Sequence, residues 1–188
     1  MRIIAGRYRG RWLEVPAQPG LRPTGNRIRE TLFNWLAPVV EGARCLDLFA
    51  GSGALGFEAA SRGAARVVLV DSNPAQIRLL VEARDRLQAE TVEVVAADAL
   101  DWLASPAPGQ FDLVFVDPPF QAGLTAGCCA ALASGGWLAA GALVYLETAR
   151  RAVVPQLPPV WTVVRAREAG EVRYLLVRAG DQQRGVKT

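Results

Sequence analysis

Residues 115–120, F-V-D-P-P-F, end an apolar stretch on a carboxylate, two prolines and an aromatic ring. The prolines alone explain why a strand stops here, because each lacks an N–H group and fixes its own φ angle. Strand termination does not explain the choice of Asp117 before the prolines or of Phe120 after them. The plain alternative is a turn that ends a strand and buries a core phenylalanine.

A glycine-rich segment, G-S-G-A-L-G at residues 51–56, matches the pattern G-x-G-x-x-G between a predicted strand and a predicted helix. Asp71 ends the next predicted strand about twenty residues further on, where dinucleotide-binding folds carry an acid for ribose hydroxyls. Glycines let the backbone approach a ligand closely, and the start of the helix offers unpaired N–H groups. The pattern predicts a nucleotide-like cofactor, with a tight packing turn and an NAD site as the alternatives.

Asp47 lies just before the glycines, where a carboxylate would repel the pyrophosphate of NAD but suits the cationic end of a ligand. S-adenosylmethionine has an α-ammonium, a sulfonium and a ribose diol but no phosphate. Asp47 is therefore expected at its methionine end and Asp71 at its ribose. Asp98 is expected at the adenine amino edge, and it equally suits an N-cap before Ala99. The predicted cofactor-binding residues are Asp47, Phe49, Gly51, Ser52, Gly53, Asp71, Asp98 and Ala99.

The composition excludes several classes of protein and of chemistry. The 188 residues suffice for one domain, 51% of them are hydrophobic, and the longest apolar run is too short to cross a bilayer. No histidine is present, which removes the commonest general base, the Ser–His triads and most zinc sites. The three cysteines have neither disulfide nor metal spacing and are interpreted as core residues in a reducing cytosol. Because the N-terminus has no secretory signal, we expect a cytoplasmic protein. We also expect a monomer that uses neither a membrane nor a metal.

The pattern of apolar residues predicts a single α/β domain over residues 1–188. A basic N-terminal extension, residues 1–40, contains a hairpin around Gly10 and a helix over 26–36, and residues 181–188 form a loose tail. Strands are expected at 44–49, 66–71, 91–96, 111–117 and 142–147, alternating with helices that end near Ser61 or span 74–87, 99–103 and 124–133. Strands at 161–165 and 172–178 form a closing antiparallel hairpin. Ligands of doubly wound sheets lie at the carboxyl ends of the strands, where four successive strands here place acids.

Positive charge is concentrated at the N-terminus. Residues 1–30 carry seven arginines against two glutamates, a net of +5, while the rest of the chain has 14 basic and 16 acidic residues, a net of −2. A basic head on a mildly acidic body suits a polyanionic partner, and a solubilising face is the alternative.

The segments D-L-F-A-G-S-G-A-L-G, residues 47–56, and D-P-P-F, residues 117–120, resemble those of class I S-adenosylmethionine-dependent methyltransferases that act on exocyclic amino groups of nucleobases. With M-R-I-I-A-G-R-Y-R-G-R at the N-terminus and R-P-T-G-N-R-I-R-E-T-L-F-N-W-L from Arg22, the resemblance narrows to the bacterial 16S ribosomal RNA guanine-N2 methyltransferases of the RsmD type. G-E-V-R-Y-L-L-V-R at 170–178 also fits, so nearly the whole chain is covered. Two positions depart from the family pattern: Asn26 stands where an aspartate is usual, and Asp71 where a glutamate is frequent.

The resemblance implies a Rossmann-like fold with a seven-stranded, mostly parallel sheet whose last strand is antiparallel. It implies S-adenosylmethionine as cofactor and, as substrate, one guanine of the guanine-966 type in 16S ribosomal RNA, within the small ribosomal subunit or its assembly intermediate. Asp117 and the carbonyl of Pro118 then each accept one N–H bond of the guanine amine. Pro119 keeps the turn from becoming helix, and Phe120 stacks on the extruded base. The RNA-binding residues implied by the family and the basic head are Arg7, Arg9, Arg11, Arg22, Thr24 and Arg27.

Three other functions stay open on the sequence. D-P-P-F also serves DNA adenine-N6 and cytosine-N4 methyltransferases, although this chain has no room for a separate DNA-recognition domain. An RNA-binding assembly factor would keep the fold without the chemistry, although the intact acids and glycines argue against such decay. An NAD oxidoreductase is the third.

Overall fold

The computed structural model describes residues 1–14, 25–119, 124–153 and 155–180. The predicted roles of Arg22, Thr24 and Phe120 and the predicted tail at 181–188 lie outside the described residues. The chain divides into two compact units, Met1–Ala99 and Leu100–Thr188. The predicted cofactor-binding residues belong to the first unit, and Asp117 belongs to the second.

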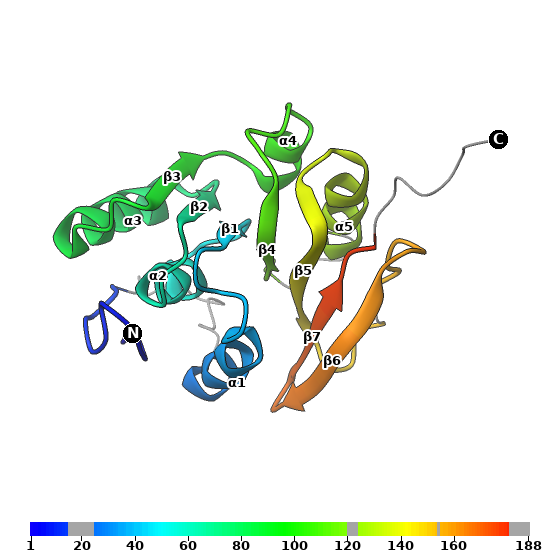
Figure 1. Cartoon of the computed structure of the whole chain (residues 1–188), viewed down its shortest axis with the longest axis horizontal. Coiled ribbons are helices and arrows are strands. Elements are labelled where there is room, and N and C mark those ends of the chain that lie inside the picture. The colour runs from blue at the N-terminus through cyan, green and yellow to red at the C-terminus, as the bar shows by residue number, and fades with distance from the viewer. Residues whose placement is uncertain (15–24, 120–123, 154, 181–188) are drawn as a thin grey trace. The chain divides into compact units, whose positions relative to one another are not determined.

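The first unit contains three parallel strands and the helices that connect them. Its elements are α1 (Asn26–Leu36), β1 (Arg44–Asp47), α2 (Ala54–Ser61), β2 (Arg66–Asp71), α3 (Pro74–Leu87) and β3 (Val92–Ala96). β1 and β3 both pair with β2 in parallel, and α2 and α3 pack against these strands (Figure 1). The near-continuous burial of β1 and β2 is typical of parallel strands covered on both faces. α3 begins as predicted, with the side-chain oxygen of Asn73 accepting the N–H of Ala75 at 2.9 Å.

The second unit combines a parallel pair of strands with an antiparallel hairpin. After α4 (Ala99–Leu103), whose first residue ends the first unit, come β4 (Phe111–Val116), α5 (Leu124–Ser134), β5 (Leu138–Ala149), β6 (Thr162–Ala169) and β7 (Val172–Arg178). β4 and β5 pair in parallel, and β7 is antiparallel to both β5 and β6. Trp137 is fully buried, with its ring centroid 4.6 Å from that of Trp102 and 6.3 Å from that of Phe111. These three rings form an aromatic part of the core of this unit.

The seven strands form a sheet in the order β3-β2-β1-β4-β5-β7-β6. This order and the antiparallel β7 confirm the predicted seven-stranded α/β fold. Two strands are longer than predicted: β5 starts at Leu138 rather than Ala142, and β6 continues to Ala169 rather than ending at Arg165. β5 begins earlier because Leu138 already pairs with Phe111 on β4, before the glycine at 141. β6 continues because pairing with β7 carries it through the charged residues Arg167 and Glu168, which give no apolar signal.

The predicted N-terminal hairpin is present, but its strands are reduced to a single antiparallel bridge between Arg2 and Trp12. Gly6 and Gly10 both have φ of +80° and form the turn. A Cβ atom on Gly6 would overlap the carbonyl oxygen of Ser61 at the end of α2. One bridge is too little to hold this segment by itself, so its position depends on contacts with α2.

Glu58 on α2 anchors the hairpin. Its carboxylate accepts the N–H groups of Ile4 at 2.7 Å and Ala5 at 3.1 Å, and it pairs with Nε of Arg62 at 2.8 Å. Nη1 of Arg29 on α1 lies 3.9 Å from Glu58, and both side chains are fully buried. One buried carboxylate therefore connects the hairpin and α1 to α2.

We expect the substitution Glu58→Ala to lower the free energy of unfolding by about 3–5 kcal/mol, because it leaves a buried guanidinium without its counter-ion and two backbone N–H groups without their acceptor. Chemical denaturation measures this difference. The control is Glu93→Ala, which removes an ion pair with Arg66 whose side chains are 38% and 54% exposed. That change should cost less than about 1 kcal/mol. Equal losses for the two variants would show that Glu58 is not a buried anchor.

Candidate active site

The glycine-rich turn between β1 and α2 serves both packing and ligand access. Gly53 is the N-cap of α2 with φ of +75°, and a Cβ atom there would overlap the ring of Phe57. A Cβ atom on Gly56 would overlap the side chain of Leu69 on β2, so this glycine allows close packing of helix and strand. Gly51 has φ of +53°, and a Cβ atom there would meet only the carbonyl oxygen of Phe49, at 3.9 Å. The space beside Gly51 is thus open to a ligand.

Asp71 fixes this turn from the end of β2. Its Oδ2 accepts the N–H of Gly51 at 2.8 Å, and its Oδ1 accepts the N–H of Asn73 at 2.8 Å. The side chain is half-buried, so its orientation is set while part of it stays accessible. Each carboxylate oxygen has a second lone pair, which suits the ribose hydroxyls expected here.

Asp47 lies at the end of β1 with only 2% of its surface exposed. Its Oδ2 accepts the N–H of Gly56 at 3.1 Å, so the carboxylate also braces the first turn of α2. Burial, together with the negative charge of Asp71, raises the pKa of Asp47 to about 7 despite backbone hydrogen bonds from Gly56 and Phe49. This side chain therefore changes charge near neutral pH.

The other predicted cofactor-binding residues lie in the same unit. Phe49 and Ser52 belong to the turn before α2 and are half-buried. Asp98 directly precedes α4, the position expected of an N-cap, and is exposed, while Ala99 is buried. Contact of these four residues with the adenosine or methionine part of the cofactor stays a prediction.

In the second unit, Asp117 comes directly after β4, as the sequence predicts. Asp117 is half-buried, Pro118 is buried and Pro119 is exposed, and all described peptide bonds are trans. A carboxylate and the carbonyl of the next residue thus follow the carboxyl end of a buried strand, where α/β proteins bind their ligands.

A buried Tyr–Glu pair beside Asp117 was missed from the sequence. The hydroxyl of Tyr145 donates to Oε2 of Glu147 at 2.8 Å, and the two side chains on β5 are 1% and 5% exposed. Burial raises the pKa of Tyr145 well above its usual value, and the negative charges of Glu147 and Asp117 add to the shift. Asp117 therefore lies within electrostatic range of this pair. An acid and a phenol two residues apart at the end of an apolar strand are the only signal in the sequence.

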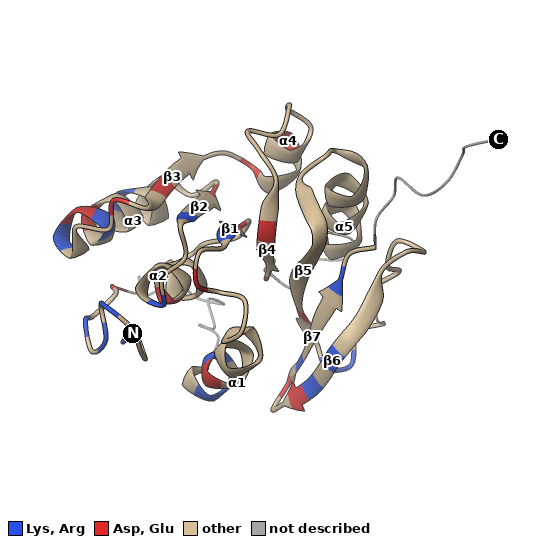
Figure 2. Ribbon diagram, in the orientation of Figure 1, with Lys and Arg blue, Asp and Glu red and all other residues tan. Residues whose placement is uncertain are grey.

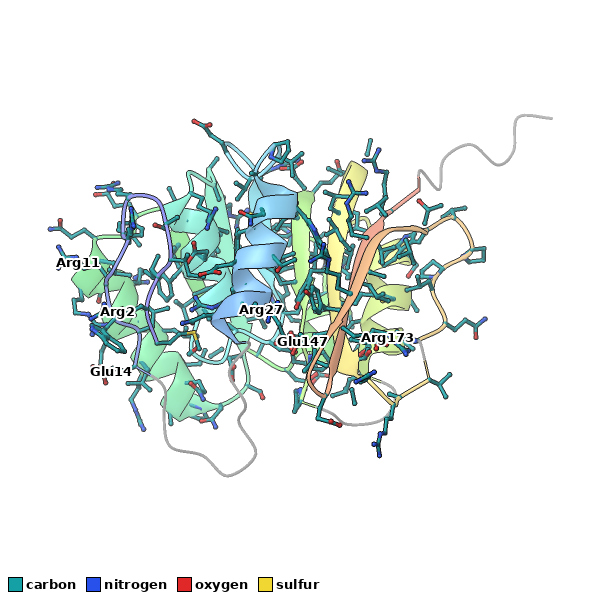
Figure 3. The ribbon with its side chains drawn as sticks, turned by 90° about the horizontal axis from the view of Figure 1, so that it is seen from below. Arg2, Arg11, Glu14, Arg27, Glu147 and Arg173 are labelled. Atoms are coloured by element: carbon teal, nitrogen blue, oxygen red, sulfur yellow. The ribbon has the colours of Figure 1, made fainter. Side chains whose placement is uncertain are left out.

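The basic N-terminal segment keeps most, but not all, of its charge at the surface. Arg7, Arg9, Arg11 and Arg27 are exposed (Figure 3 labels Arg11 and Arg27). Arg29, which the sequence count includes in the basic head, is fully buried, so that count overstates the positive surface. Nη2 of Arg29 donates to the carbonyl of Arg2 at 2.9 Å and to Oδ1 of Asn26 at 2.7 Å. The residue that departs from the family pattern thus serves as an acceptor for the buried arginine.

Within the described residues, no three His, Cys, Asp or Glu side chains are grouped closely enough to hold a metal ion. Across the same parts of the chain, no helix has the length and apolar character needed to span a membrane.

Residues 1–178 match the family described as conserved hypothetical protein 95. The ribosomal RNA small subunit methyltransferase D of Escherichia coli strain K12 is 47% identical over 176 residues, which cover 94% of this chain and 88% of that protein. A solved structure described as putative methyltransferase yhhF from Escherichia coli has a TM-score of 0.89 and 44% identity, covering 97% of this chain and 99% of that one. An RNA methyltransferase from Salinibacter ruber in complex with S-adenosyl-L-homocysteine shares the fold, with a TM-score of 0.66 at 16% identity over 88% of this chain and 98% of that one.

These similarities confirm the expected class I methyltransferase fold, methyl transfer as the reaction and S-adenosylmethionine as the cofactor. The NAD oxidoreductase is thereby excluded, while the roles of individual site residues stay predictions. The chain belongs to the conserved hypothetical protein 95 family, that of the ribosomal RNA small subunit methyltransferases D.

Proposed function

We propose that this enzyme methylates N2 of one guanine in 16S ribosomal RNA, within the small subunit or its assembly intermediate, as a cytoplasmic monomer. The observation that carries the proposal is the acceptor pair Asp117 and Pro118 in a chain 47% identical to a ribosomal RNA small subunit methyltransferase. The exposed arginines Arg7, Arg9 and Arg11 on the N-terminal hairpin suit a polyanionic substrate.

The chemical difficulty lies in the nucleophile. The lone pair of a guanine amine is delocalised into the ring, so the nitrogen attacks poorly unless it is oriented. The carboxylate of Asp117 and the carbonyl of Pro118 each accept one N–H bond of the amine, which directs its lone pair toward the methyl donor. A near-attack arrangement contributes about 7–11 kcal/mol, whereas general acid–base help amounts to about 10²–10⁴-fold. Orientation is therefore sufficient in a protein without histidine.

The charge that develops during transfer is the second requirement. Methyl transfer from the cofactor would leave the amine nitrogen with a positive charge until its extra proton passes to solvent. The carboxylates of Asp117 and Glu147, with Tyr145 donating to the latter, produce a negative potential on this side of the unit. Such a preorganised field stabilises positive charge that develops at the amine.

The first unit fits S-adenosylmethionine better than a cofactor with phosphate groups. Bound S-adenosylmethionine supplies an electrophilic methyl group on a sulfonium. Gly51 leaves open space, Asp71 presents a fixed carboxylate for ribose hydroxyls, and Asp47 offers a second acid on the cationic side. Two carboxylates next to one turn would repel a pyrophosphate.

Label from methyl-labelled S-adenosylmethionine should enter undermethylated small subunits or 16S RNA and not duplex DNA. We expect Asp117→Ala to abolish this transfer while the Kd for S-adenosylmethionine stays within about tenfold, or 1.4 kcal/mol, because Asp117 contacts the base rather than the cofactor. Filter-bound label and calorimetry measure the two quantities.

Asp85→Ala is the control, since that carboxylate on α3 is exposed and pairs only with Arg84 among the described residues. It should leave both quantities unchanged. Label that enters only DNA would reject the rRNA assignment, and equal loss of transfer and of cofactor affinity in Asp117→Ala would place this residue in the cofactor site instead.

The affinity for S-adenosylmethionine should rise about fivefold between pH 6 and pH 7. The reason is that the cationic methionine end binds the ionised form of Asp47, and with a pKa of about 7 the ionised fraction grows over this range as protons are lost. Calorimetry at a series of pH values measures the change. Asp47→Asn should bind more weakly at pH 7 and show no such slope. A wild-type affinity independent of pH would show that Asp47 only braces α2.

A further inference from the structure

The segment Arg150–Arg178 is a basic region inside the part of the chain that has a net negative charge. It carries six arginines against Glu168 and Glu171, a net of +4. Figure 2 shows several of these arginines as blue segments on β6 and β7. The net charge counted from residue 31 to the C-terminus conceals this basic region, because acidic residues before Arg150 offset its positive charge.

β6 is the outermost strand of the sheet order, and β7 is the strand with which it pairs. Most side chains of β6 are exposed, on both of its faces, and Val163 is 49% exposed. A long exposed edge strand invites pairing with other strands unless charges or a bulge prevent it. β6 has both, so the backbone edge is poorly suited to a protein strand.

The irregularity in β6 decides which way its arginines point. Val163 pairs with Val177, but Arg165 pairs with Leu176, so one extra residue stands between the two pairs. Regular pairing would place Arg165 opposite Leu175 and turn its side chain to the other face. A bulge shifts the alternation by one residue and re-aims every side chain that follows.

Because of this bulge, Arg165 and Arg167 lie on the same face of the sheet as Asp117. Arg167 is opposite Tyr174, and Tyr174 is in turn opposite Glu147 on β5. Residues opposite one another point to the same face. Asp117 follows β4 on that face too, two residues after Phe115, whose ring lies 6.4 Å from that of Tyr145.

On the opposite face of the hairpin, two arginines share one glutamate. Glu168 pairs with Arg150 at 2.9 Å and with Arg173 at 3.0 Å. Within the described part of the chain, no carboxylate pairs with Arg165 or Arg167, which are both exposed. Arg165 and Arg167 therefore present positive charge without a paired carboxylate on the face of Asp117.

We propose that Arg165 and Arg167 bind phosphate groups of the RNA that carries the target base. The inference rests on the proposed function and adds a second RNA contact, distinct from the N-terminal hairpin. Two exposed arginines whose backbone positions lie about 7 Å apart along a strand suit a polyanion, because arginine binds phosphate oxygens through two parallel hydrogen bonds. A purely protective role at the sheet edge requires charge, but it does not require both charges on the face of Asp117.

The test compares Arg165→Gln and Arg167→Gln, singly and together, with Ala166→Glu. Each single change alters the net charge by −1 on the same strand, but Ala166 is exposed and pairs with Leu175, so its side chain is on the opposite face. The affinity for 16S RNA is measured at several salt concentrations, together with kcat and KM on undermethylated small subunits. The Kd for S-adenosylmethionine checks that every variant is folded.

The double variant should reduce the slope of log Kd against log salt by about 1.5, since each lost phosphate contact removes about 0.7–0.9. Its KM for RNA should rise while kcat stays unchanged. Arg165→Lys with Arg167→Lys should restore most of the affinity, and Ala166→Glu should resemble the wild type. An unchanged slope, or an equal effect of Ala166→Glu, would overturn the inference.

Two further outcomes separate the possible errors. If the double variant loses activity on small subunits but binds naked RNA with the wild-type slope, the surface meets a ribosomal protein and the RNA assignment is wrong. If the wild type labels neither subunits nor 16S RNA, the proposed function fails. The salt slopes still decide whether these arginines bind RNA.

Discussion

The structure of the first unit depends on a helix of eight residues, all of them buried. At the start of α2, Gly53 leaves room for the ring of Phe57 in the same helix, and Gly56 allows the helix to pack closely against Leu69 on β2. At its end, Glu58 and Ser61 hold the N-terminal hairpin through backbone hydrogen bonds. Because every residue of α2 is buried, close packing surrounds the helix and fixes its position. The glycine-rich turn before α2 and the N-terminal hairpin are therefore both positioned by α2.

The buried charge on this helix determines part of its surroundings. Removing a carboxylate from water is costly unless donors replace the water, and Glu58 receives two backbone N–H groups and Arg62. Arg29 in turn donates to Arg2 and Asn26. An asparagine at position 26 fulfils this role with a neutral acceptor. The basic sequence of the first thirty residues is thus divided between a structural arginine and exposed ones.

In a protein without histidine, the carboxylates of the candidate site lie in contrasting surroundings. Asp47 is buried, and burial raises its pKa to about 7. Asp71 is held by two N–H donors and stays half-exposed. In the second unit, Asp117 lies near the buried pair of Tyr145 and Glu147. The three aspartates thus differ in burial and in their hydrogen-bond donors.

The sequence alone was sufficient to predict the order of the elements and the bounds of α1, β2, α3, α4 and β7. Caps, prolines, glycines and apolar spacing are local signals, and they act within a few residues. The glycine turn and Asp117 were predicted for the same reason, since strand ends and turns mark them.

The burial of Arg29, the Tyr145–Glu147 pair and the direction of Arg165 were decided only by the tertiary structure. Each depends on a part of the chain distant in the sequence. Arg29 is buried beside Glu58, the Tyr145–Glu147 pair lies near Asp117 at the end of β4, and the direction of Arg165 follows from its register with β7. Because side chains alternate along a strand, a single extra residue in a pairing exchanges its two faces. Composition and spacing contain no record of that register.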